Sequence, residues 1–243
     1  EVRIITASSG NHGMACALAA SRLGIPATVV VPVPTPQIKK DYIRSLGANL
    51  LEIGETYDDS FLAACELAET EKMFYVHPVS DRYTVAGQGT ITLELLEQIP
   101  DLDQVIVPIG GGGLITGISF TMKQLKPSVK LVGVMPEGSA VYYASRQAGN
   151  LLTVEHCASM ADACVRKTGE PYLYPYIEQY VDEIVTVTEE SIRKAVKMAC
   201  LYGKLTLEGA GAMPLAALLE NKCQAIGKTV LICSGGNIDQ KVL

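Results

Sequence analysis

The stretch Val105-Ile106-Val107-Pro108-Ile109-Gly110-Gly111-Gly112-Gly113-Leu114 decides the fold of this chain. A run of β-branched residues leads into four glycines, and a helical pattern then continues to Leu125, which predicts strand, loop and helix in that order. Successive glycine N–H groups and a helix N-terminus can converge on one anion. We therefore predict a phosphate-binding loop at Gly110–Gly113. The alternative is a tight turn in which glycine only permits close packing.

The glycine spacing argues against the two common nucleotide motifs. Ile115 and Thr116 stand where the dinucleotide fingerprint needs its third glycine, and no Gly-Lys-Ser/Thr follows, so a P-loop is excluded. Glu137 follows the next expected strand and can imitate the acid that binds a ribose. A nucleotide-binding domain is therefore kept as a weak alternative.

Outward from this stretch, strand patterns alternate with helical periodicity along the whole chain. Such repeated β-α units predict an α/β fold with a mostly parallel sheet flanked by helices. The expected strands are Arg3–Thr6, Ala27–Val31, Asn49–Ile53, Met73–Val76, Gln104–Ile109, Lys130–Val134, Glu183–Val187 and Thr229–Cys233. The expected helices are Asn11–Leu23, Gln37–Leu46, Tyr57–Thr70, Val85–Gln98, Leu114–Leu125, Ser139–Gln147, Glu189–Tyr202 and Ala210–Leu219. Residues 151–173 read as irregular, and the turn-rich segment His77–Tyr83 suggests a small domain at 1–80 and a large domain at 81–243.

Composition narrows the class of protein. The chain has 243 residues, 48% of them hydrophobic and 19% charged, which fits a compact folded protein. A net charge of −6 without a basic stripe argues against nucleic acid, and no apolar run is long enough to cross a membrane. Seven cysteines without a C-x-x-C pair, and only three histidines, argue against disulfides and zinc, and we expect a cytoplasmic protein.

Two polar loops and one acidic residue are the other candidate site elements. Ser8-Ser9-Gly10-Asn11-His12-Gly13 joins a strand to a helix and can hold a carboxylate, or Ser or Asn there is only a helix N-cap. Ser234-Gly235-Gly236-Asn237 follows the last strand, so a single hydroxyl is presented where ligands collect in open α/β sheets. Glu208 precedes a helix among small residues. It is either an acid beside the helix dipole or a carboxylate that faces a site.

Taken together, these motifs resemble one family. The loop Ser8–Gly13, then His77-Pro78, Ala86-Gly87-Gln88-Gly89-Thr90, the four glycines, Glu208–Ala212 and Ser234–Asn237 occur in the order found in fold-type II pyridoxal-phosphate enzymes of the serine/threonine dehydratase and serine racemase family. The resemblance covers essentially the whole chain. It implies two open, mostly parallel sheets flanked by helices, as in the tryptophan synthase β subunit.

The resemblance also implies a role for each candidate residue. Gly110, Gly111, Gly112 and Gly113, with the amide of Leu114, would bind the phosphate of pyridoxal 5'-phosphate. Asn11 would bind the ring hydroxyl oxygen, and Ser234 would meet the pyridine nitrogen. Ser8, Ser9, Asn11 and His12 would hold the substrate carboxylate. Ser9 would be the acid/base opposite the lysine in a racemase, and Glu208 would order the polar network at the ring's edge.

Two departures from the family pattern are visible. The family bonds its cofactor to a lysine in an S-x-K-x-R-G-like segment upstream of the first loop, whereas this chain opens directly on the strand that leads to Ser8. We therefore expect an N-terminal segment, as part of the chain or as a separate peptide, and expect the 243 residues alone to be inactive. The positions of the family's divalent-cation acids correspond to Met135 and Val141, so we expect no metal site.

The resemblance implies that the parent enzyme converts L-threonine or L-serine into a 2-oxo acid and ammonia. A serine racemase is the nearest alternative, and a catalytically dead module that binds phosphate or pyridoxal phosphate is an alternative of another class. The expected partner is a small amino acid, and by analogy we expect a homo-oligomer, either a dimer or a tetramer.

Overall fold

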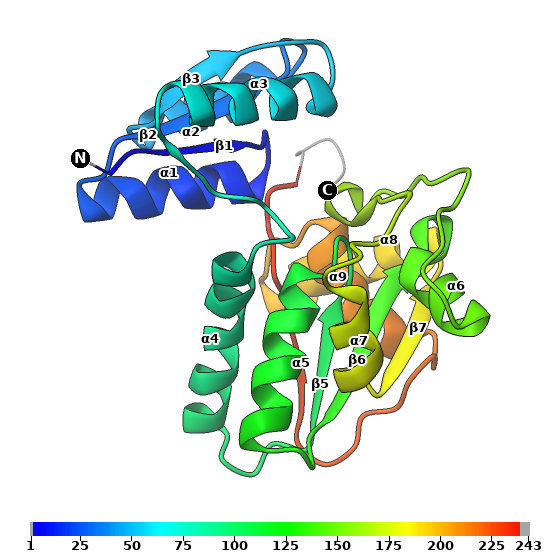
Figure 1. Cartoon of the computed structure of the whole chain (residues 1–243). Coiled ribbons are helices and arrows are strands. Elements are labelled where there is room, and N and C mark those ends of the chain that lie inside the picture. The colour runs from blue at the N-terminus through cyan, green and yellow to red at the C-terminus, as the bar shows by residue number, and fades with distance from the viewer. Residues whose placement is uncertain (1, 239–243) are drawn as a thin grey trace. The chain divides into compact units, whose positions relative to one another are not determined.

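The computed structural model describes residues 2–238, which form two compact units (Figure 1). The first unit extends to Asp81 and the second begins at Arg82. Each unit is an open parallel sheet of four strands with helices on both faces. In the described part of the chain, no helix combines the length and the apolar character needed to cross a membrane.

The sheet of the first unit has the strand order β3-β2-β1-β4. All of its pairings are parallel, with Ile4 opposite Ala27 and Ile5 opposite Tyr75 in the register. Its elements in chain order are β1 (Ile4–Ala7), α1 (Asn11–Leu23), β2 (Ala27–Val31), α2 (Gln37–Ser45), β3 (Asn49–Glu52), α3 (Tyr57–Thr70) and β4 (Phe74–Tyr75). Since β-α-β crossovers join the strands, their carboxyl ends meet at one edge of the sheet, where Ser8–Gly10 follow β1.

Both faces of this first sheet are buried. Val29 and Val31 of β2 pack against Ala17 and Ala20 of α1, while Val30 on the opposite face packs with Ala64 of α3. This alternation explains why β2 is buried at every position and is apolar everywhere except at Thr28.

The second unit repeats the arrangement around the order β7-β6-β5-β8, again with parallel pairings throughout. Leu231 of β8 lies opposite Ile106 of β5, so these two strands are neighbours. Its strands and α-helices are α4 (Arg82–Gln98), β5 (Gln104–Pro108), α5 (Gly113–Leu125), β6 (Lys130–Pro136), α6 (Val141–Ala148), α7 (Tyr174–Tyr180), β7 (Glu183–Val187), α8 (Glu189–Met198), α9 (Gly209–Leu219) and β8 (Thr229–Leu231).

The main core of the second unit lies between its sheet and the helices α8 and α9. Ile106, Val132 and Val134 of the sheet contact the small residues of α9, among them Ala212 and Ala216. The alanines of α9 let this helix approach the strands closely, so its start is held near the carboxyl ends of β5 and β8. Helices α4 and α5 pack along each other (Figure 1).

The expected elements were found, with differences at some ends and one omission. Helix α7 was not expected, because its seven residues, Tyr174–Tyr180, carry too short a pattern and contain Pro175. The helix expected to reach Tyr202 ends at Met198 and continues as a π-turn over Ala199–Gly203. In the irregular stretch the structure contains a Thr153–Thr168 bridge and a 3-10 turn at Asp162–Cys164.

Candidate functional site

The glycine loop has the geometry of an anion site. It joins β5 to α5, whose N-cap is Gly112 in the left-handed region at φ 98°, with no capping side chain. Within the described residues, none of the backbone N–H groups of Gly111–Leu114 donates to another group of the chain. Four N–H groups at a helix N-terminus are therefore open to an anion. In the first turn, the Thr116 hydroxyl is also buried without a partner among these residues.

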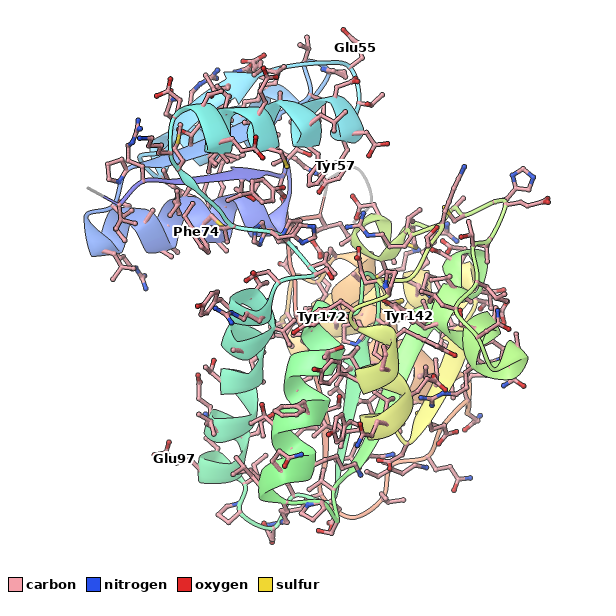
Figure 2. The ribbon with its side chains drawn as sticks, in the orientation of Figure 1. Glu55, Tyr57, Phe74, Glu97, Tyr142 and Tyr172 are labelled. Atoms are coloured by element: carbon pink, nitrogen blue, oxygen red, sulfur yellow. The ribbon has the colours of Figure 1, made fainter. Side chains whose placement is uncertain are left out.

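Tyr142 fixes the shape of this loop. This residue of α6 (Figure 2) has a fully buried side chain. Its hydroxyl donates to the Gly111 carbonyl at 2.9 Å and accepts from the Glu170 N–H at 2.8 Å. Burial raises the pKa of the Tyr142 hydroxyl to about 12, so it stays protonated and able to donate. A Cβ at Gly112 would stand 2.9 Å from this hydroxyl and from Ile177 Cδ1. The loop therefore needs glycine at position 112 for conformation and for space.

The Ser234–Asn237 turn lies at the same edge of the second sheet. It follows β8, the neighbour of β5, and its Ser234 hydroxyl is exposed, with no partner in the part of the chain that is described. Glu208, the N-cap of α9, holds the turn: its N–H donates to the Gly235 carbonyl at 3.0 Å, and its Oε2 accepts from the Asn237 N–H at 3.2 Å. Glu208 is only 6% exposed. Glu208 therefore lies at the helix N-terminus, as the first interpretation expects, and its carboxylate also binds the Ser234–Asn237 turn.

Residues 158–166 support both of these elements, and sequence reasoning missed them. A Cβ at Gly110 would meet the Ala163 carbonyl at 2.8 Å and Cys164 Cα at 2.9 Å. A Cβ at Gly209 would meet the Met160 carbonyl at 2.9 Å. The nearest signal in the sequence is the pair of glycines themselves, since each marks a close backbone approach whose partner is remote in the chain.

In the first unit, Ser8–Gly13 forms a second strand–loop–helix junction. The N-cap of α1 is Gly10, so the N-cap residue itself supplies no capping side chain. The Ser8 hydroxyl instead accepts from the Gly10 N–H at 3.2 Å. A Cβ at Gly13 would lie 2.2 Å from the Ser8 carbonyl, whereas one at Gly10 would meet nothing within 4 Å. Packing therefore requires Gly13, while the surroundings of Gly10 leave space.

His12 is held in a neutral form. Its Nε2 lies 3.1 Å from the Val76 carbonyl, so this nitrogen carries the hydrogen and donates it. Burial lowers the pKa of His12 and outweighs the hydrogen bond to Val76, which acts to raise it, while the nearby His77 lowers it further. Cys16 Sγ lies 3.4 Å from the same nitrogen, and burial raises the pKa of this thiol to about 11. The imidazole is therefore a fixed, uncharged part of the loop.

The structure brings the predicted residues together in two sets. Ser8, Ser9, Asn11 and His12 share one junction in the first unit, and Gly110–Leu114, Glu208 and Ser234 share one sheet edge in the second. Each set therefore lies entirely within one unit.

The residues considered for a ribose or a metal have other surroundings. Glu137 is exposed and pairs with Lys222 at 3.5 Å, while Met135 and Val141 are fully buried in the core. Among residues 2–238, no three His, Cys, Asp or Glu side chains are grouped as metal ligands.

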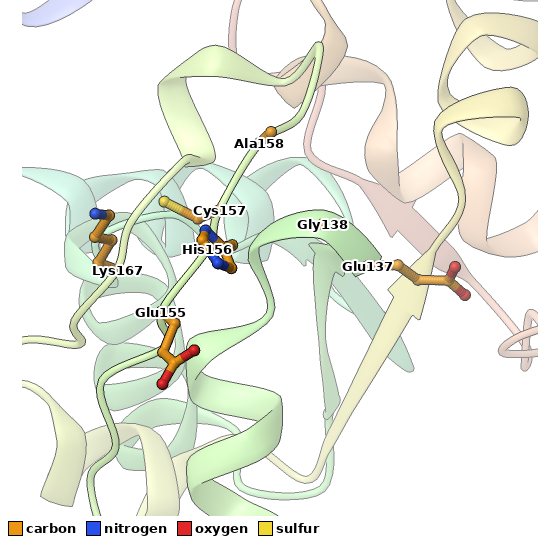
Figure 3. Close-up of a pocket in the computed structure, with 7 residues that line it drawn as sticks. All are labelled: Glu137, Gly138, Glu155, His156, Cys157, Ala158 and Lys167. Carbon is orange, nitrogen blue, oxygen red and sulfur yellow. The ribbon is translucent and has the colours of Figure 1, made fainter.

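An open hollow of about 580 Å³ lies beside the irregular segment of residues 151–173 (Figure 3). Figure 3 shows the Glu137 carboxylate directed away from His156 and Lys167. The residues that line the hollow are Glu137, Gly138, Glu155, His156, Cys157, Ala158 and Lys167. Its charges are mixed and mostly exposed, and none of the residues predicted to hold the cofactor or the substrate lines it.

Comparison with known proteins identifies the family. The sequence profile described as "Pyridoxal-phosphate dependent enzyme" matches residues 1–235. The chain belongs to this family. It is 41% identical over 241 residues to an L-threonine ammonia-lyase of Geobacter sulfurreducens, an alignment that covers 99% of the chain and 60% of that relative. It is 40% identical to a catabolic L-threonine dehydratase of Staphylococcus aureus, covering 98% of the chain and 70% of the relative.

Solved structures of relatives have the same fold. Processed threonine deaminase isoform 2 of Solanum lycopersicum superimposes with a TM-score of 0.91 at 35% identity, over 98% of this chain and 66% of that one. Maize serine racemase superimposes with a TM-score of 0.92 at 34% identity, over 98% and 74%. The two parallel four-stranded sheets are therefore those of fold-type II enzymes. The chain spans 60% of the length of the first curated relatives it matches.

The residues of the second unit fit the family's cofactor, pyridoxal 5'-phosphate. The open N–H groups of Gly111–Leu114 suit a phosphate dianion, and any side chain at Gly112 would fill the space beside Tyr142. The uncharged Ser234 hydroxyl suits a neutral pyridine nitrogen. When bound, this cofactor supplies an electron sink for the carbanion that forms when the α-proton leaves an amino acid.

Proposed function

We propose that the natural protein deaminates L-threonine, or L-serine, to a 2-oxo acid and ammonia. The observation that carries this proposal is the bare glycine loop, whose four open N–H groups lie at the sheet edge that also presents Ser234. Relatives named threonine ammonia-lyase and threonine dehydratase, at 41% and 40% identity, support the choice of reaction. The two units would then be the small and large domains of the enzyme.

The second unit would bind the cofactor. Gly110–Gly113 and the Leu114 N–H would hold the phosphate, with Tyr142 keeping the loop in shape through the Gly111 carbonyl. The Ser234 hydroxyl would meet the pyridine nitrogen and leave it unprotonated. An uncharged ring withdraws electrons less strongly, which favours elimination over chemistry that needs a longer-lived carbanion.

The first unit would bind the substrate. The Ser8 and Ser9 hydroxyls, with the Asn11 side chain and the backbone N–H of His12, are the groups proposed to hold the substrate carboxylate. Asn11 would also bind the ring hydroxyl oxygen of the cofactor. The neutral His12 imidazole would not donate to that carboxylate, because its Nε2–H is committed to Val76 and its Nδ1 is then only an acceptor.

Ser9 is the residue on which the proton chemistry of this proposal depends. Its side chain is half-buried, and its hydroxyl has no partner among residues 2–238. A free hydroxyl can give a proton to one face of a carbanion, as racemisation requires, or take no part when the β-hydroxyl leaves. Glu208 would act by holding the turn that carries Ser234, as its contacts with Gly235 and Asn237 indicate.

The test uses the natural full-length protein, loaded with pyridoxal phosphate and given L-threonine or L-serine. Coupled detection should show stoichiometric release of 2-oxo acid and ammonia, and Ser234→Ala should slow it while Tyr172→Phe, an exposed change elsewhere in the second unit, should not. Cofactor binding without turnover of either amino acid would support a dead binding module instead.

A serine racemase is the second candidate, favoured by the 0.92 TM-score with the maize enzyme. Chiral analysis of the serine recovered from the same reaction distinguishes the two. Accumulation of D-serine that Ser9→Ala abolishes would establish racemisation. We further propose a homo-oligomer, by analogy with the family, and a reducing compartment such as the cytoplasm, because all seven cysteines are free thiols.

A further inference from the structure

Two anchors for one rigid cofactor must stay at a fixed separation, and the sheet alone does not provide this. Strands β5 and β8 are joined by hydrogen bonds up to the Ile232 N–H, which donates to the Ile106 carbonyl at 3.0 Å. The glycine loop and the Ser234–Asn237 turn both lie beyond that last bond. Other contacts must therefore set the distance between the phosphate anchor and the ring anchor.

The first of these contacts joins the turn to the start of α9. Besides the two hydrogen bonds of Glu208, a Cβ at Gly211 would lie 2.5 Å from the Gly235 carbonyl, and one at Gly236 would lie 2.5 Å from the Thr206 carbonyl. The turn and the first residues of α9 are thus in direct backbone contact, so neither can shift without displacing the other.

The second set of contacts joins α9 to the glycine loop through residues 160–164. At one end, Met160 and Ala161 abut Gly209, where a Cβ would lie 3.0 Å from both Ala161 N and Cα. At the other end, Cys164 abuts Gly110, where a Cβ would lie 3.3 Å from its Sγ. Ala161 and Cys164 are both buried in the core that contains α9.

This segment is itself held on its outer side. The Ser139 hydroxyl, 1% exposed, accepts from the Arg166 N–H at 2.9 Å. Glu189 Oε2 accepts from the Met160 N–H at 2.9 Å. With both ends fixed, residues 160–164 cannot yield easily when either neighbour presses on them.

We propose that residues 160–164 are a spacer that sets the separation of the two cofactor anchors, and that Gly209, Cys164 and Glu208 are positioning residues. This inference rests on the proposed function, since it needs a cofactor that bridges the glycine loop and Ser234. None of the three acts as a proton donor or acceptor in it. The affinity for a ligand that reaches only one anchor should not depend on the spacer, whereas the affinity for a ligand that spans both anchors should.

The test is Gly209→Ala, which presses on the spacer and leaves the glycine loop and the Ser234 turn unchanged in sequence. In the natural full-length protein, pyridoxal phosphate affinity is measured by fluorescence titration and inorganic phosphate affinity by ³¹P NMR. Pyridoxal phosphate should bind at least about tenfold more weakly, because misplacement by a fraction of an ångström disfavours a two-point contact. Inorganic phosphate should bind within about twofold of the wild type. Cys164→Ala, which removes the sulfur beside Gly110, should show the same split to a smaller degree.

The matched control is Gly203→Ala in the same unit, where a Cβ would meet nothing nearer than 3.7 Å, and both affinities should stay at the wild-type value. Unchanged pyridoxal phosphate affinity in Gly209→Ala and Cys164→Ala would overturn the spacer. Equal losses for pyridoxal phosphate and inorganic phosphate would also overturn it, since they would mean that the segment supports only the loop. If the wild-type protein binds no pyridoxal phosphate, the proposed function itself fails.

Discussion

The Ser8–Gly13 loop of the first unit and the Gly110–Gly113 loop of the second solve the same local problem differently. Both join a parallel strand to a helix whose N-cap is glycine, so in neither does the N-cap residue supply a capping side chain. In the first loop the N-cap, Gly10, has φ −114°, and the polar groups are side chains. In the second, Gly112 has φ 98°, and the polar groups are backbone N–H groups.

The difference teaches how the two loops acquire their rigidity. The first loop is held by a contact inside the loop, where the Ser8 carbonyl packs against Gly13, and by the hydrogen bond from His12 to Val76, the residue that follows β4. The second is bare, so distant residues hold it, among them Tyr142 and Cys164. A loop whose polar groups are side chains can be specified by its own residues. A loop whose polar groups are backbone amides needs packing from other parts of the chain to hold its shape.

The largest expected effect separates the two glycines of the first loop. Gly13→Ala should lower the unfolding free energy of the first unit by about 3 kcal/mol, because its Cβ would overlap the Ser8 backbone carbonyl. Hydrogen exchange of the β1 and β2 amides measures this. Gly10→Ala, with open space around it, should cost less than about 1 kcal/mol. Equal losses in the two variants would contradict the account of this loop.

In the second loop, Gly112→Ala should cost about 2 kcal/mol and weaken phosphate binding. The alanine would be strained at a positive φ and would press on Tyr142 and Ile177. Gly149→Ala is the matched control, since Gly149 has φ 73° but nothing within 4 Å, so strain alone should cost about 1 kcal/mol. If the two variants unfold alike in urea, the contact with Tyr142 is unimportant.

Removing one hydroxyl tests whether the bare loop depends on distant support. Tyr142→Phe should cost about 1–2 kcal/mol, because the Gly111 carbonyl and the Glu170 N–H lose their partner. Inorganic phosphate should also bind more weakly, as ³¹P NMR would detect. Tyr172→Phe, at a side chain 49% exposed, should leave both measurements unchanged. Wild-type phosphate binding in Tyr142→Phe would mean that the loop keeps its shape by itself.

A helix with a conventional cap provides the contrast to both loops. Thr56 caps α3 by accepting from the Asp59 N–H, in a reciprocal capping box. Thr56→Ala should therefore lower the unfolding free energy by about 1 kcal/mol without any change in ligand binding. Thr56→Ser keeps the hydroxyl and should restore most of the loss. A change in substrate or cofactor affinity in Thr56→Ala would contradict the distinction between a helix start that is only capped and one that binds a ligand.

The smallest expected effect is a pH dependence of the first loop. Burial lowers the pKa of His12 in the folded state, so the unfolded chain binds more protons between that lowered value and the ordinary value of about 6.5. The His12 contribution to stability is therefore full above about pH 6.5 and is lost as the pH falls through the folded pKa. Urea unfolding from pH 7 to pH 5 should show this slope, and His12→Gln should reduce it. An unchanged slope in His12→Gln would assign it to another group.

Local patterns predicted most elements of both units, and the reasons are visible in particular residues. Strand β2 consists of one alanine and four β-branched residues, and α5 follows directly from a glycine run, so both were clear from neighbours in the chain. Helix α7 was missed because seven residues with a proline carry little periodic signal. Residues 158–166 were read only as irregular, since their role depends on contacts with Gly110 and Gly209, which are remote in sequence.

The sequence by itself determined the order of strands and helices, the family resemblance, and the placement of glycines and hydroxyls at strand ends, because these depend on local periodicity and on backbone freedom. Only the tertiary structure decided that Glu208 is committed to the Ser234 turn, that His12 is pinned to Val76, and that Tyr142 and residues 160–164 support the glycine loop. These contacts join residues far apart in the chain, and close packing between such segments is a property of the folded core that no local pattern encodes.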